Sequence, residues 1–229
     1  MITAVGGYPT QSWGQDGYGL EVTTADEAAG AVRQLKSAGA VVVKIPFDGG
    51  GPVLSDEAIG SAVGAAHAAG LLVFAHALGE AAAARAARLG VDGLAHTPVE
   101  PLTEATIAAW RGRYVISTLR AFGGSDTAVA NLRSLRAAGA VVLYGTDFGN
   151  TTEAGIDHEE VRLLGEAGLD GEAILAAGTS VPAALWGYTD LGSVEPGKAA
   201  SLLVLDADPR LDPSTLTRPV TVWMDGLAR

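Results

Sequence analysis

The sequence predicts an α/β fold built on a parallel β-sheet, and three observations lead to this expectation. Short runs rich in Val, Ile and Leu alternate with longer Ala-rich stretches, which is the pattern of strands that alternate with helices. A glycine closes most of the Ala-rich stretches, as expected at helix C-termini. The strand runs are apolar on both faces, so helices should cover both sides of the sheet.

The strands and helices of this alternation can be placed in order. Thr24 and Glu27 have the spacing of a capping box, which starts the first helix, and Ser55, Thr103 and Ser125 are N-cap candidates for later ones. Helices are expected over residues 24–38, 55–69 and 80–89, after Thr103, and from Ser125 to Gly139. Strands are expected over residues 2–5, 40–45, 71–75, 91–95, 114–117 and 140–145. Periodicity alone does not distinguish an open doubly wound sheet from a barrel.

The pattern changes after Gly145. Short helices are expected over residues 157–166, 170–177 and 182–186, followed by a turn-rich segment at 192–198. Strands at 201–205 and 220–224, separated by a loop over 206–213, then resemble a small β appendage instead of another strand–helix unit. We therefore expect a main domain over residues 1–190 and an appendage over 191–229.

Composition excludes several classes of partner. The chain has 26 acidic against 15 basic residues and a pI near 4.7, so no nucleic-acid or anionic-membrane surface is expected. No targeting segment is visible at the N-terminus, and no apolar run approaches the roughly 18 residues of a membrane span. We expect a soluble cytoplasmic protein. Cysteine is absent, so any metal ligands must be His, Asp, Glu or a modified Lys.

Polar residues stand at the ends of four of the expected strands: Lys44, His76, His96 and Asp147. They follow their helix-ending glycines by five, six, six and eight residues. Because the carboxyl edge of a parallel sheet is where barrels and open α/β sheets build their sites, we expect these four residues to surround one cavity.

Each of these residues also has a structural interpretation. A single His at a strand end is more often a hydrogen-bonded structural group than a ligand, and a lone Asp there is usually a cap or turn residue. Lys44 is one of only three lysines and is enclosed by Val, Ile and Pro, so burial should lower the pKa of its ammonium. A neutral lysine amine can accept carbon dioxide and become a carbamate, an anionic metal ligand. Together, the four residues favour a divalent-metal site.

These residues resemble the metal-site motifs of the amidohydrolase superfamily, in the imidazolonepropionase-like branch that includes Xaa-Pro dipeptidase-type and aryl-dialkylphosphatase-like members. The resemblance implies a TIM-like (β/α) barrel and one or two divalent ions, zinc first. Lys44 matches the strand-four lysine that is carboxylated in many relatives, and His76 and His96 match the histidines of strands five and six. Asp147, in the segment Gly-Thr-Asp, matches the strand-eight aspartate that contacts metal and acts as the general base.

The chain departs from the family pattern in two places. Residues 192–198 resemble the return into the family's small β-sandwich, but Ala200-Ser201-Leu202 replaces the usual Ala-Asp-Leu. The His-x-His pair of the family's first strand does not occur, and residues 2–7 resemble its third strand. We therefore expect an incomplete barrel with about strands 3–8 of 8.

The resulting expectation is a metal-dependent hydrolase that activates water for attack on an amide, lactam, dipeptide or ester bond of a small molecule. A catalytically incompetent fragment or assembly subunit is the alternative. A homo-oligomer or a complementary N-terminal chain is the expected protein partner. A phosphate-binding barrel isomerase that uses the loop 49–51 is a second alternative. Tyr8, Arg120 and His158 are candidate substrate contacts on loops expected near the same cavity.

Overall fold

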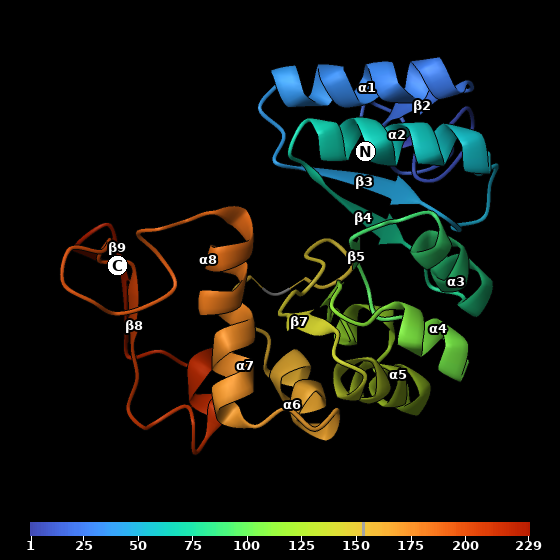
Figure 1. Ribbon diagram of the computed structural model, residues 1–229. Coiled ribbons are helices and arrows are strands. Elements are labelled where there is room, and N and C mark those ends of the chain that lie inside the picture. The colour runs from blue at the N-terminus through green and yellow to red at the C-terminus, as the bar shows by residue number, and fades with distance from the viewer. Residues whose placement is uncertain (153) are drawn as a thin grey trace. The chain divides into compact units, whose positions relative to one another are not determined.

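The computed structural model describes residues 1–152 and 154–229 (Figure 1). The chain divides into two compact units. Unit 1 contains residues 1–116 and 134–141, and unit 2 contains residues 117–133 and 142–229. The two units are described in turn.

A parallel sheet forms the centre of unit 1. Its strands are β3 (Val42–Pro46), β4 (Leu72–His76), β5 (Gly93–Leu94) and β6 (Tyr114–Ile116). The five-stranded order is β3-β4-β5-β6-β7, and of β7 (Val141–Leu143) only Val141 belongs to unit 1. Adjacent strands are consecutive in the sequence and parallel from β3 to β6, so each pair is joined by a crossover that contains a helix. The predicted α/β class with a parallel sheet is confirmed.

The first predicted strand lies in a sheet that is separate from the other predicted strands. Strand β1 (Ile2–Ala4) pairs in parallel with β2 (Leu20–Val22) in a separate two-stranded sheet. Strand β2 was not predicted, because Leu-Glu-Val follows a glycine-rich stretch with little local strand propensity. Its pairing depends on a non-local contact that the sequence does not reveal: the Leu20 amide donates to the Met1 carbonyl at 2.9 Å.

The helices of unit 1 begin at the predicted N-caps. Helix α1 (Ala25–Ser37) begins after Thr24 with the predicted capping box, and the Ser55 and Thr103 side chains accept backbone N–H groups at the starts of α2 (Asp56–Ala68) and α4 (Glu104–Ala109). Helix α3 (Glu80–Arg88) begins after Gly79. The glycines after α1, α2 and α3 all have positive φ angles, as expected for residues that terminate helices.

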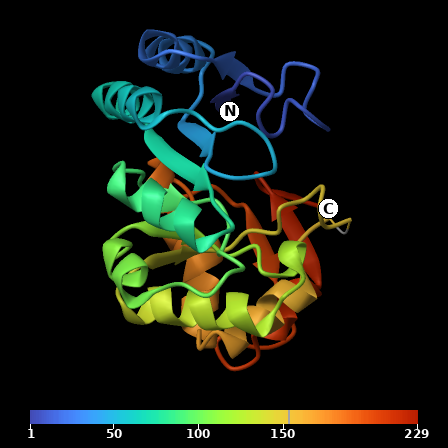
Figure 2. The same ribbon diagram turned by 90° about the vertical axis from the view of Figure 1, so that its right-hand side faces the viewer.

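Helices α1 and α2 lie side by side and on the same side of β3 and β4 (Figures 1 and 2). Their buried faces consist mostly of Ala with a few larger side chains, which lets the helices approach the sheet closely. Val32, Ile45 and Ile59 are fully buried in this core. Burial of each such side chain contributes about 1.5 to 3 kcal/mol relative to exposure.

Unit 2 consists mainly of short helices and an antiparallel sheet. Its helical elements are η1 (Arg120–Phe122), the first part of α5 (Asp126–Ala137), α6 (His158–Glu166), α7 (Gly171–Gly178), α8 (Ser180–Trp186) and η2 (Pro213–Thr217). Asp157 and Asp170 cap α6 and α7 at the predicted positions. None of the helices in the described part of the chain is long and apolar enough to cross a membrane.

The C-terminal residues form the three-stranded antiparallel sheet of unit 2, in the order β10-β9-β8. Strands β8 (Leu202–Val204) and β9 (Thr221–Met224) lie within the predicted segments. Strand β10 (Leu227–Ala228) was not predicted, because two residues are too short for a periodic signal.

Candidate functional site

The register of β3 and β4 places Lys44 and His76 on the same face of the sheet. Lys44 pairs with Phe74, and Pro46 pairs with His76. Residues two apart on a strand share a face, so the Lys44 and His76 side chains project to the same side. Lys44 is the central residue of β3, whereas the expected strand over residues 40–45 placed it one residue from the end. Its long side chain still reaches His96.

The structure brings Lys44, His76 and His96 together. The Lys44 Nζ and His96 Nε2 atoms are 3.3 Å apart, and the His76 and His96 ring centroids are 5.0 Å apart in an edge-to-face arrangement. Both histidines are 3% exposed, so their rings are buried. His76 ends β4, and His96 follows β5 by two residues. Three of the four predicted residues therefore form one cluster.

Burial keeps the His96 imidazole neutral. Desolvation, and then the positive charges of Lys44 and of protonated His76, lower the pKa of His96 to about 2. An ammonium has only donor hydrogens, so a charged Lys44 must donate to the Nε2 lone pair of His96. A neutral imidazole with a lone pair directed into a polar cluster is the form that binds metal ions.

Tyr8 lies against the same cluster. Its ring stacks on His76 with centroids 4.4 Å apart and an interplanar angle of 20°. Gly49 makes room for it, since a Cβ added at Gly49 would lie 2.6 Å from Tyr8 Cγ. Tyr8, predicted as a substrate contact, is thus adjacent to the predicted metal ligands. The glycine at position 49 therefore serves close packing against Tyr8. Phosphate binding by the loop 49–51 stays a prediction.

Asp48 is a fourth polar residue at this cluster, and sequence reasoning missed it. Its Oδ2 accepts the Leu78 and Gly79 amides at 2.7 and 2.9 Å, and its Oδ1 lies 3.5 Å from His76 Nε2. Desolvation raises the pKa of the Asp48 carboxyl above its ordinary value. The signal that could have revealed it is its position two residues after β3, at the same edge of the sheet as His76.

Asp147 belongs to unit 2, in the loop that follows β7. Its backbone is left-handed, with a φ of 50°. The carboxylate accepts the Asn150 side-chain amide at 2.7 Å, and the Asp147 carbonyl accepts the Asn150 amide at 3.0 Å. These local bonds hold the loop in a tight turn. The predicted catalytic and metal-binding role of Asp147 stays a prediction.

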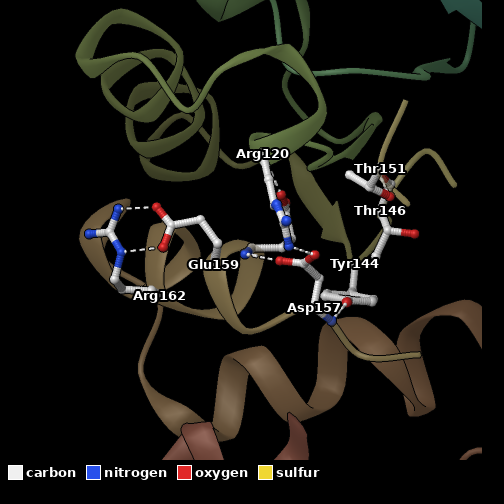
Figure 3. Close-up of polar contacts among 8 residues, drawn as sticks. Arg120, Tyr144, Thr146, Thr151, Asp157, Glu159 and Arg162 are labelled. Carbon is white, nitrogen blue, oxygen red and sulfur yellow. Dashed lines mark hydrogen bonds and ion pairs between the residues drawn. The ribbon is translucent and has the colours of Figure 1, made fainter. Parts of the chain in front are cut away.

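Arg120 and His158, the other predicted substrate contacts, also lie in unit 2. Arg120 forms an ion pair with the buried carboxylate of Asp157 (Figure 3). Asp157 caps α6 and has its own amide bonded to the Tyr144 hydroxyl at 2.7 Å. Arg120 therefore joins the 3₁₀ turn after β6 to the start of α6. His158 is exposed in the first turn of α6. Their substrate contacts remain predictions.

Glu160 completes this network and was also missed by sequence reasoning. It is fully buried, and its two carboxylate oxygens accept the Leu119 and Arg120 amides at 3.0 and 2.8 Å. Desolvation raises the pKa of Glu160, and burial raises the pKa of the Tyr144 hydroxyl to about 12. A charged residue on the buried face of a helix gives no periodic signal, because periodicity counts apolar positions.

Comparison with known proteins decides the family. The amidohydrolase family model matches residues 18–228. The chain belongs to the amidohydrolase family. Uncharacterized proteins of Mycobacterium tuberculosis and Mycobacterium bovis are each 30% identical to it over 201 residues, which cover 76% of this chain and 52% of those proteins. This amidohydrolase-family chain thus spans about half the length of the curated relatives it matches.

Solved structures show the same relationship. A Xaa-Pro dipeptidase with bound methionine has a TM-score of 0.82 and 25% identity, over 100% of this chain and 66% of that one. The structure of an amidohydrolase has a TM-score of 0.79 and 26% identity, over 100% of this chain and 67% of that one. A putative prolidase from Bifidobacterium longum has a TM-score of 0.75 and 27% identity over 92% and 61%. The predicted incomplete (β/α) barrel agrees with these structures, which extend beyond the part this chain matches.

The family implies a divalent metal, and the side chains of unit 1 fit such an ion in part. Two imidazole donors, His76 and His96, are adjacent, and Lys44 becomes a third donor only as a carbamate. Among the described residues, no group of three or more His, Asp and Glu side chains is arranged to hold a metal. Because a catalytic zinc site usually has about three protein ligands, modification of Lys44 is what would complete this set.

Proposed function

We propose that this amidohydrolase-family chain carries the metal-binding and proton-transfer residues of a metal-dependent hydrolase that acts on amide, lactam, dipeptide or ester bonds. The observation that supports it best is the contact of Lys44 with His96 at 3.3 Å beside the His76 ring. A half-buried lysine on β3 beside two buried histidines, one at the end of β4 and one just after β5, has the chemistry of a nitrogen and carbamate ligand set.

Each residue has a defined role in this proposal. His76, His96 and carboxylated Lys44 would hold a divalent ion, most simply zinc, and Asp147 would be a further ligand and the general base. When bound, the ion supplies the charge that lowers the pKa of water toward about 7 and polarises the scissile carbonyl. Asp147 accepts the proton from the attacking water. Tyr8, Arg120 and His158 would contact substrate.

The solved structures that resemble this chain suggest which substrates to test first. They include a prolidase complexed with N-methylphosphonate-L-proline, at 25% identity, as well as the Xaa-Pro dipeptidase. Dipeptides whose second residue is proline are therefore the first class, followed by other dipeptides, lactams and aryl esters. Hydrolysis of a dipeptide should release its two amino acids in equal amounts, measured by ninhydrin reaction and mass spectrometry. A lactam should give one ring-opened amino acid, and an aryl ester should give a carboxylate and a phenol.

Metal analysis tests the ligand set. The purified chain, loaded with zinc in bicarbonate buffer and desalted, should retain metal, and His76→Ala should lower the retained metal at least several-fold. His67→Ala is the matched control, because His67 lies on α2 and contacts Asp92 instead of the cluster. Undiminished zinc in His76→Ala would remove His76 from the ligand set.

Carboxylation of Lys44 has its own signature. With ¹³C-bicarbonate, a carbamate carbon signal should appear in the wild-type spectrum and be lost in Lys44→Gln. Lys36→Gln controls for nonspecific modification, because Lys36 is exposed at the end of α1. A spectrum in which the two variants behave alike would reject Lys44 as the modified residue.

A non-catalytic subunit is the second candidate, and one observation favours it: the chain matches only 52% of its curated relatives and 66% of the Xaa-Pro dipeptidase structure. Such a subunit would bind zinc through His76 and His96 without turnover until a complementary chain is added. Metal binding together with turnover by the chain alone would exclude it.

A further inference from the structure

The Asp48 carboxylate lies between a loop and a histidine ring, and its two oxygens have different partners. Oδ2 accepts the amides of Leu78 and Gly79 at 2.7 and 2.9 Å, which are the second and third residues after His76. Oδ1 is buried and makes no hydrogen bond within the described chain, but lies 3.5 Å from His76 Nε2. One oxygen therefore anchors the loop that follows His76, and the other faces its ring.

This anchoring limits where the carboxylate can move. Two backbone donors at the N-terminal end of α3 hold Oδ2, and in this orientation the other oxygen, Oδ1, faces the imidazole. A carboxylate at neutral pH only accepts hydrogen bonds. The favourable tautomer of a neutral His76 thus carries its proton on Nε2, toward Asp48, since a lone pair there would face a negative oxygen.

We propose that Asp48 is a positioning residue that holds His76 with its proton on Nε2, so that the Nδ1 lone pair is the atom available to a metal ion. Metal binding through Nδ1 rests on the proposed function, whereas the tautomer that Asp48 holds does not. A carboxylate that fixes the tautomer of a metal-binding histidine also raises the basicity of the ligand atom, and loss of such a partner typically weakens metal binding about 10- to 100-fold.

Tyr8 and Gly49 support the same role from the other side of the ring. Tyr8 stacks on the His76 face at 4.4 Å, while Asp48 approaches its Nε2 edge. The residue after Asp48 is Gly49, whose missing Cβ gives Tyr8 its place. Asp48 and Gly49 together fix the imidazole at its edge and, through Tyr8, at its face. Rotation of the ring is then restricted before any ion binds.

The chain contains a matched control for this arrangement. Asp92 also bridges a backbone amide and a histidine: its Oδ2 accepts Val73 N at 2.7 Å and contacts His67 Nε2 at 2.9 Å. His67 lies on α2, outside the cluster. Asp92→Asn therefore removes a carboxylate charge beside a histidine ring, as Asp48→Asn does, but leaves the surroundings of His76 unchanged.

The test is the tautomer of His76 in the metal-free 229-residue chain. Long-range ¹⁵N–¹H correlation spectra of ¹⁵N-histidine-labelled protein distinguish protonated Nε2 from protonated Nδ1, and His76→Gln assigns the signal. We expect the Nε2–H form in the wild type and in Asp92→Asn. In Asp48→Asn the amide oxygen keeps the Leu78 and Gly79 bonds while the NH₂ group faces the ring, so the proton should move to Nδ1.

Zinc affinity by competition with a chromogenic chelator provides the second readout. Asp48→Asn should bind about 10- to 100-fold more weakly than the wild type, and Asp92→Asn should match the wild type. A wild-type Nδ1–H tautomer overturns the inference, and so does an unchanged tautomer in folded Asp48→Asn. If Asp48→Asn does not fold, the wild-type spectrum alone decides. Correct tautomers without zinc binding would sustain the positioning role and reject the proposed function.

Discussion

The left-handed backbone of Asp147, with a φ of 50°, is a feature that local propensity does not explain. Residues other than Gly rarely adopt this conformation, although Asp tolerates it better than most. Such outliers concentrate at functional sites, where surrounding bonds hold them. Here the Asn150 amides supply those bonds. The conformation motivates the catalytic hypothesis for Asp147, which activity measurements on Asp147→Asn would test.

The close contact between Gly49 and Tyr8 predicts that substitution of Gly49 lowers the free energy of unfolding. In Gly49→Ala the new Cβ would overlap Tyr8 Cγ at 2.6 Å, at a φ of 117°. Gly50→Ala is the matched control, because its φ is 82° but no atom lies within 4 Å of the added Cβ. Both variants should lose free energy of unfolding through backbone strain, and Gly49→Ala should lose about 1 to 3 kcal/mol more. Equal losses in urea denaturation would mean that Tyr8 does not occupy this place.

The raised pKa of the buried Glu160 carboxyl predicts that the free energy of unfolding depends on pH. Its pKa is raised above the ordinary 4.5, so the folded state binds the proton more tightly than the unfolded state. Stability due to this group is then fully present below pH 4.5 and falls as pH rises through the folded-state pKa, by at most about 1.4 kcal/mol per pH unit.

Glu160→Gln should lack that fall. The difference in free energy of unfolding between Glu160→Gln and the wild type, measured by urea denaturation from pH 4 upward, should shift in favour of the variant as pH rises. Part of the difference in free energy does not depend on pH. It arises because Gln has a single carbonyl oxygen, whereas the two carboxylate oxygens of Glu160 accept the Leu119 and Arg120 amides. A difference that does not vary with pH would contradict the raised pKa.

At the scale of elements, capping explains why the helices begin where they do. Thr24 accepts the Glu27 amide while the Glu27 carboxylate accepts the Thr24 amide, so two amides at the start of α1 that lack intrahelical partners are satisfied. Thr24→Ala should lower the free energy of unfolding by about 1 kcal/mol, whereas Thr24→Ser should retain most of it because the hydroxyl remains. Thermal denaturation of the three proteins checks this, and equal losses in both variants would assign the effect to the methyl group instead.

The strands show where local sequence signals end. Strand β4 has five residues and was predicted within one residue of each end, whereas β5 has two and was predicted as five. Gly93 explains part of this difference. A Cβ there would lie 2.3 Å from the Phe74 ring, so this ring occupies the space that a side chain at position 93 would need. A close approach of this kind depends on a residue nineteen positions earlier, which periodicity does not detect.

At the scale of the whole molecule, the C-terminal sheet leaves apolar side chains exposed. The register of β8, β9 and β10 places Leu203, Met224 and Leu227 on one face, and they are 39, 54 and 61% exposed. Exposed apolar clusters commonly mark contact surfaces. We expect the 229-residue chain on its own to self-associate through this face.

Size-exclusion chromatography with light scattering tests that expectation. Met224→Lys with Leu227→Lys should shift the chain toward the monomer, and Val41→Lys, which changes an isolated side chain that is 59% exposed, should not. A monodisperse monomer that turns over substrate at roughly 1 to 1,000 per second would show that these 229 residues suffice.

The sequence by itself determined the class of fold and most of the helix starts, and it indicated that Lys44, His76 and His96 lie close together. Caps, apolar runs and helix-ending glycines are local signals, so these features could be predicted. The tertiary structure decided which groups meet. Asp48 reaches His76 across 28 residues, Tyr8 reaches it across 68, and Glu160 bonds amides 40 and 41 residues earlier. Such contacts depend on strand register and on the path of loops, and both are set by packing between distant segments rather than by the propensity of any one of them.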